Sequence, residues 1–125
     1  MPRVWCNSNL NYATKPYIIK KQADQVCTSI IVAAELRYGV EKKGHAALTE
    51  RVEQLLAVLP ILALDQDADR YYGRLRADLE RHGQLIGAND MLIAAQALSL
   101  DAVLITDNVR EFQRVARLRI ENWLV

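Results

Sequence analysis

The stretch Gly83–Thr106 constrains the fold most, because both a helix and a strand can be read from it. A glycine-containing turn leads into the apolar run Met91–Leu98, and Asp90 falls in the first turn of this expected helix. A short polar turn and the β-rich residues 101–106 follow. This order predicts half of an α/β unit, with a carboxylate at a helix start beside the end of a strand. In open parallel sheets, ligands and metal ions bind at that place.

Hydrophobic periodicity in the rest of the chain predicts alternating strands and helices. Strands are expected at Gln25–Thr28, Ile61–Leu64 and Leu118–Ile120, and helices at Ile30–Lys43, Ala46–Leu59, Gln66–Arg81 and Val109–Val115. The first helix is expected to be capped by Thr28 or Ser29. Its buried side is expected to consist of Ile30, Ala33, Ala34 and Val40. The alternation predicts an α/β class protein, a three-layer α/β/α fold around a short central parallel sheet.

Composition bounds the class of protein. A chain of 125 residues is expected to form one domain over residues 1–125. The net charge of +1 gives no overall field for nucleic acid, so any such role requires a local patch. Cys6 and Cys27 lack the spacing of a disulfide framework or a zinc site. Because no apolar run approaches ~20 residues and no leader opens the chain, a cytoplasmic protein is expected.

Carboxylates at the ends of elements are the residues with chemical potential. The chain has no phosphate-binding glycine loop, no nucleophile elbow and no zinc-protease motif. Glu35, Asp90 and Asp107 beside Asn108 remain, and hard oxygen ligands favour Mg²⁺ or Mn²⁺ over zinc. Each has a structural alternative. Asp90 can cap its helix, Asp107 can form a turn, and Glu35 can either face water or turn inward, where it needs a cation partner.

Several segments, in their order along the chain, carry a family resemblance. They are Ala34–Gly39, Tyr72–Arg76, Ile86–Gly87 with Asp90 and Ile93–Ala95, Thr106–Asn108 with Glu111–Phe112, and Leu118 with Glu121–Trp123. Together they resemble PIN-domain ribonucleases, and among these the VapC toxins of bacterial VapBC toxin–antitoxin modules. The resemblance extends from about Asp24 to Val125.

The resemblance implies a PIN-like fold and a Mg²⁺- or Mn²⁺-dependent endoribonuclease that cleaves structured RNA such as tRNA or rRNA. It also implies a homodimer that is silenced by a cognate VapB-type antitoxin. By matching motifs, Glu35 and Asp90 are expected to be metal ligands. Asn108 falls at the fourth polar position of the family, and Asp107 either substitutes for it or faces solvent. Thr106 matches a residue that supports the site by hydrogen bonding.

The first acid of the family has no direct match. Relatives begin with an apolar strand that runs into Asp-Thr-Asn, and the nearest equivalent here is Asn7-Ser8-Asn9 after Val4–Cys6. Asn7, the expected third metal ligand, keeps an oxygen but lacks the charge, which weakens a hard-cation site. With about 20 atypical N-terminal residues, this leaves an alternative, a catalytically impaired PIN domain that still binds antitoxin or RNA. A further alternative is a small α/β interaction module in which all the acids are helix caps.

One expected helix has a basic side. Arg70, Arg74, Arg76 and Arg81 all fall on the helix predicted for Gln66–Arg81. Arginines in such a row can contact RNA phosphates or an antitoxin, although an ordinary solvated face is the more frequent explanation. The sequence leaves both interpretations open.

Overall fold

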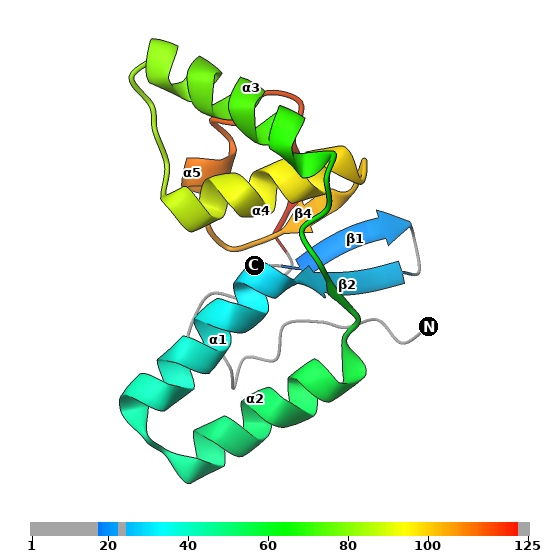
Figure 1. The fold of residues 1–125 in the computed structure, drawn as a ribbon, viewed down its shortest axis with the longest axis vertical. Helices are drawn as coiled ribbons and strands as arrows, with labels where there is room; N and C mark the ends of the chain where they lie inside the picture. The colour runs from blue at the N-terminus through cyan, green and yellow to red at the C-terminus, as the bar shows by residue number, and fades with distance from the viewer. Residues whose placement is uncertain (1–17, 23–24, 123–125) are drawn as a thin grey trace.

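A five-stranded sheet organises the part of the chain that the computed structural model describes, residues 18–22 and 25–122 (Figure 1). The strands are β1 (Ile18–Gln22), β2 (Gln25–Ser29), β3 (Ile61–Leu62), β4 (Val103–Ile105) and β5 (Arg119–Glu121). Their order across the sheet is β3-β2-β1-β4-β5. The strands β2 and β3 are parallel, as are β4 and β5.

The central strand β1 runs against both of its neighbours, β2 and β4. The sequence did not predict this strand, and it makes the sheet mixed at its centre. Only two residues separate β1 from β2, and so short a connection can join antiparallel strands but not parallel ones. The other four strands therefore all run in one direction. They end at one edge, marked by Ser29, Leu62, Ile105 and Glu121, which we call the carboxyl edge.

Five helices flank the strands. They are α1 (Ile30–Lys43), α2 (Ala46–Val58), α3 (Ala68–Arg81), α4 (Ala88–Ser99) and α5 (Val109–Phe112). In Figure 1, α1 and α2 lie below β1 and β2 as an antiparallel pair, α3 lies at the top, and α4 lies between α3 and α1 with α5 beside it. No helix in the described part of the chain is long and apolar enough to cross a membrane.

The ends of α1 follow from its capping residues. The side chain of Ser29, not Thr28, caps the helix, since its Oγ accepts a hydrogen bond of 3.0 Å from the Ile31 amide. Gly44 ends the helix in the left-handed conformation at φ 69°, which glycine adopts without strain. The predicted bounds of this helix are therefore confirmed.

The buried stripe of α1 differs from the predicted one. Ala33 and Val40 are buried as expected, together with Val32 and Leu36. Ile30, however, is 44% exposed, and Ala34 is also exposed. Residues four apart share one face of a helix, and the docked helix turns the face that holds these two residues toward solvent.

Three predicted elements are shorter in the structure. The helix expected from Gln66 begins at Ala68. The amides of Ala68 and Asp69 donate to the carbonyl oxygens of residues 65 and 66, three positions earlier, as in a tight turn and not an α-helix. The last helix ends at Phe112 and not at Val115 for the same reason. The strand expected over Ile61–Leu64 contains only two residues.

The helix α4 supplies the centre of the core. Ile93, Ala94 and Ala97 are fully buried, as their spacing predicts, and Leu98 is half-buried. The side chain of Gln96 is also buried, and its Nε2 donates to the carbonyl oxygens of residues 62 and 63 at 3.2 and 3.1 Å. This side chain therefore takes the place of a neighbouring strand where β3 ends.

Candidate functional site

The carboxyl edge brings together segments that are distant in sequence. The helix α1 begins directly after β2, and residues 106–108 directly follow β4. Because β2 and β4 lie on either side of β1 and end at the same edge, both segments start there. Crevices at such edges are the usual ligand sites of α/β sheets.

Glu35, in the second turn of α1, is turned inward. Its side chain is half-buried, and its Oε1 is buried without a hydrogen-bond partner among the described residues. The carboxylate forms a hydrogen bond with the side chain of Asn89, in the first turn of α4. Burial raises the pKa of Glu35 above its usual value of 4.5, and the hydrogen bond from Asn89 opposes that rise. Of the two interpretations left open by the sequence, the structure shows the inward one.

Asp90 lies beside Asn89 at the start of α4. Its carboxylate lies over the helix terminus, close to Gly87: a Cβ placed on Gly87 would lie 3.2 Å from Oδ2 of Asp90. Gly87 thus leaves the space that the carboxylate occupies. The amino end of a helix also favours a negative charge. The hydrogen bond between Glu35 and Asn89 therefore ties α1 to the turn of α4 that carries Asp90.

Thr106 orders the turn that follows β4. Its side chain is buried, and its Oγ1 accepts a hydrogen bond of 2.9 Å from the amide of Asn108. Asn108 is half-buried, and its Nδ2 donates to Oε2 of Glu111 at 3.0 Å, which leaves its Oδ1 as an acceptor. Asp107 is exposed. The turn thus combines the buried hydroxyl of Thr106 with the half-buried amide of Asn108 and the exposed carboxylate of Asp107.

Two contacts of the site were not predicted. Asn89 and Glu111 hold predicted site residues in place, but neither was assigned a role from the sequence. The only signal for Asn89 is its position next to Asp90. Glu111 belongs to a matched segment, yet its partner becomes visible only once the turn is folded.

The described residues do not by themselves form a metal site. Nowhere in residues 18–22 and 25–122 do three or more His, Cys, Asp or Glu side chains gather closely enough to hold a metal ion. Asn7, the expected third ligand, lies outside the described residues. The two acidic ligands expected from the sequence, Glu35 and Asp90, remain.

Comparison with known proteins decides the family. The model of the PIN domain matches residues 4–118. A relative from Rickettsia felis named ribonuclease VapC2 is 41% identical over 99 residues, which are 78% of this chain and 74% of the relative. The chain is a PIN-domain protein of the VapC family. A second VapC relative, the tRNA(fMet)-specific endonuclease VapC of Shigella flexneri, is 36% identical over 79% of this chain and 76% of its own length.

Solved structures of VapC proteins have the same fold. The crystal structure of VapBC2 from Rickettsia felis, bound to a DNA fragment from its promoter, superposes with a TM-score of 0.76 at 39% identity. The match covers 82% of this chain and 78% of that one. The resemblance to VapC proteins and the PIN-like α/β fold predicted from the sequence are both confirmed.

Proposed function

We propose that this VapC-family chain is an endoribonuclease toxin that works with a divalent metal ion, Mg²⁺ or Mn²⁺, held at the carboxyl edge. The observation that carries the proposal is the buried Oε1 of Glu35, which has no hydrogen-bond partner among the described residues. A buried carboxylate oxygen is costly unless something compensates it, and a cation is the natural compensation. Asp90, next to the residue that bonds Glu35, provides a second carboxylate.

The donor set fits a hard divalent cation. Carboxylate and amide oxygens suit Mg²⁺ and Mn²⁺, whereas zinc sites require histidine or cysteine. When bound, such an ion lowers the pKa of a coordinated water and offsets charge on a scissile phosphate. Glu35 and Asp90 would hold it, with Asn7 as the third ligand. Ile18 pairs with Ile105 at the carboxyl edge, and the chain between Asn7 and Ile18 can span at most about 40 Å.

The remaining site residues act as positioning groups in this proposal. Thr106 fixes the turn after β4 through its hydroxyl, and Asn108 offers its Oδ1 as an acceptor there. Asp107 is exposed, so its proposed part is to add negative charge at the mouth of the site. Asn89 steadies Glu35 with a hydrogen bond that favours the ionised form of the carboxylate.

Relatives support the choice of substrate and partners. One relative is named a tRNA(fMet)-specific endonuclease, and matched structures are VapBC complexes. We therefore propose structured RNA such as tRNA or rRNA as the substrate, a VapB-type antitoxin as the partner, and a homodimer as the assembly.

Cleavage of tRNA under titration with Mg²⁺ and Mn²⁺ tests the proposal. We expect cleavage by the unaltered chain and a loss of at least about 100-fold in Asp90→Asn and in Glu35→Gln, since each removes a charged ligand. Asp69→Asn on α3 and Glu41→Gln on α1 are matched controls, because both side chains are exposed. Equal activity in Asp90→Asn and Asp69→Asn would remove Asp90 from the site.

A catalytically impaired PIN domain is the second candidate. It is favoured by Asn7, which stands where the matching family motif has an acid and would bring no charge to the ion. If cleavage appears only after Asn7→Asp, the native chain is a binding protein for antitoxin or RNA. We also expect Asn7→Asp to tighten Mg²⁺ binding, measured by calorimetry. Unchanged affinity would show that Asn7 is not a ligand.

A further inference from the structure

An open cleft lies between α3, the end of α4 and the turn after α5. Its volume is about 340 Å³, at the lower end of the range for small-ligand sites. One wall is the face of α3 that carries Tyr71, Arg74 and Arg81, and the opposite wall is the turn after α5, which carries Arg117. Its floor is apolar, formed by Leu75, Leu98 and Val115. None of these residues belongs to the site at the carboxyl edge.

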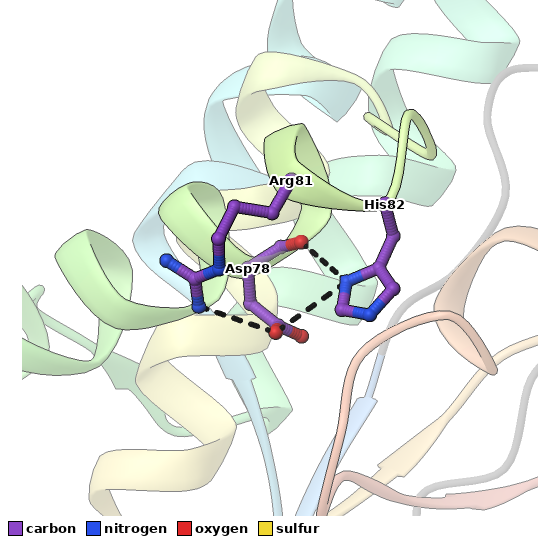
Figure 2. A network of polar contacts seen from close by, with 3 residues as sticks. All are labelled: Asp78, Arg81 and His82. Atoms are coloured by element: carbon purple, nitrogen blue, oxygen red, sulfur yellow. Dashed lines mark hydrogen bonds and ion pairs between the residues drawn. The ribbon is translucent and has the colours of Figure 1, made fainter.

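The charge of the cleft favours an anionic ligand. Three arginines and one aspartate line it. Figure 2 shows that Asp78 is shared, since its Oδ1 lies 3.4 Å from Nη2 of Arg81 and 3.6 Å from Nδ1 of His82. The side chains of Arg74 and Arg117 form no ion pair or hydrogen bond with any other described residue. Two guanidinium groups on opposite walls are therefore free to bind a ligand.

The backbone at Arg117 adds to this assignment. Its φ of 68° lies in the left-handed region, which a residue with a side chain rarely adopts. Glycine would satisfy that backbone without strain. The local fold therefore does not require arginine at this position, and its side chain extends into the cleft.

We propose that the cleft binds one unstacked nucleotide of an RNA substrate, with its phosphate on Arg74 and Arg117 and its base against Tyr71 and the apolar floor. Proteins recognise single-stranded RNA with this combination of arginines for phosphates and apolar or aromatic surfaces for bases. A partner helix would instead insert a row of anchors along a longer groove. The inference rests on the proposed action on RNA.

The distance to the candidate catalytic site suits this role. Asp90 and Leu98 are eight residues apart on α4. Leu98, on the floor of the cleft, therefore lies about 12 Å along the helix axis from Asp90. An RNA strand would cover that distance with about three to four stacked nucleotides. The cleft would then hold a loop nucleotide while the scissile phosphate lies at the carboxyl edge.

Binding without cleavage provides the first test. The probes are a fluorescein-labelled RNA hairpin and its blunt duplex stem, with anisotropy measured in EDTA against salt concentration. We expect Arg74→Gln with Arg117→Gln to weaken hairpin binding about tenfold and to flatten the salt dependence by about 0.7 log units per log unit of salt, since one phosphate contact is lost. The control is Arg51→Gln with Arg70→Gln, which removes the same charge from exposed positions outside the cleft. Equal losses in the two double variants would overturn the proposal.

The variant Arg117→Gly separates binding from folding. It relieves the strained backbone, so we expect a higher Tm together with weaker hairpin binding. Weaker binding with a lower Tm would overturn this assignment of Arg117. The duplex stem lacks an unstacked base, so it should bind more weakly than the hairpin and respond little to the variant.

Two other occupants of the cleft, an acidic protein and a second copy of the chain, would give different experimental results. A polyglutamate peptide whose binding is lost in the cleft variant, while hairpin binding matches the control, would assign the cleft to an acidic protein partner. A cleft variant that dissociates a dimer in sedimentation experiments, with hairpin binding unchanged, would assign it to a second copy of the chain. An unaltered chain that binds the hairpin through the cleft but never cleaves it with Mg²⁺ would instead contradict the nuclease proposal alone.

Discussion

Glu35 has a raised pKa, and its buried Oε1 has no hydrogen-bond partner among the described residues, so its charge opposes folding at neutral pH. A carboxyl group whose pKa is raised in the folded state contributes stability below its unfolded value of 4.5, and this contribution is lost as the pH rises through the folded pKa. Near neutral pH without metal, the ionised group is therefore a net cost. Because the side chain is only half-buried, solvent screening keeps this cost small.

The variant Glu35→Gln removes that charge. In EDTA at pH 7 we expect its Tm to exceed that of the unaltered chain by about 1–3 °C, with the difference vanishing as the pH falls below 4.5. Added Mg²⁺ should raise the Tm of the unaltered chain, because an ion that binds the folded state stabilises it. It should not raise the Tm of the variant, which lacks the charged ligand. Thermal melts at several pH values measure both effects, with Glu41→Gln on the same helix as the control. A lower Tm for Glu35→Gln at pH 7 in EDTA would contradict this account.

At the scale of elements, the start of α4 depends on a missing side chain. A Cβ on Gly87 would come within 3.2 Å of Oδ2 of Asp90, so Gly87→Ala forces that carboxylate to shift by a few tenths of an ångström. The backbone of Gly87, at φ −58° and ψ 149°, accommodates alanine. We expect Mg²⁺ affinity and RNA cleavage to fall several-fold while the free energy of unfolding changes by only about 0.5–1 kcal/mol.

A second glycine provides the matched control for that variant. Gly73 lies within α3, and an added Cβ there would meet no atom within 4 Å. Gly73→Ala should stabilise the protein by about 0.5–1 kcal/mol and leave metal affinity unchanged. Calorimetric titration and urea unfolding measure the two quantities. If both glycine variants bind Mg²⁺ like the unaltered chain, the placement of Asp90 does not depend on Gly87.

Elements with local signals were predictable, and elements fixed by distant contacts were not. The bounds of α1 follow from Ser29 and Gly44, which act within one turn of the helix. The strand β1 lacks such a signal in its own residues, because its place depends on pairing with β2 on one side and with β4, more than 80 residues away, on the other. The inward turn of Glu35 could not be predicted either. It depends on which face of α1 docks onto α4, and the sequence-based stripe was placed on a different set of residues.

For the whole molecule, four strands in one direction and one against them put the start of α1 and the turn after β4 at one edge. The resemblance to VapC proteins correctly indicated the PIN-like α/β fold, although the sheet is not parallel at its centre. Residue patterns alone identified the carboxylates as candidates but left their convergence open. The contact that the structure does show, between Glu35 on α1 and Asn89 on α4, depends on how these two helices dock in the folded chain.

One buried side chain links α4 to the edge of the sheet, and its loss should weaken the whole fold. Gln96 donates to the carbonyls of Leu62 and Ala63, while its own Oε1 is buried without a partner among the described residues. Replacement by leucine, of similar size, removes the unpaired oxygen but also removes the donor for two carbonyls. The loss of two hydrogen bonds costs more than the removal of one unpaired buried oxygen gains. We therefore expect Gln96→Leu to lower the free energy of unfolding by about 1–2 kcal/mol and the Tm by about 5 °C. Urea unfolding measures this change, and Gln54→Leu at an exposed position of α2 should stay within about 0.5 kcal/mol. If Gln96→Leu instead stabilises the chain, the unpaired oxygen is the larger effect and α4 is held to the sheet by apolar packing alone.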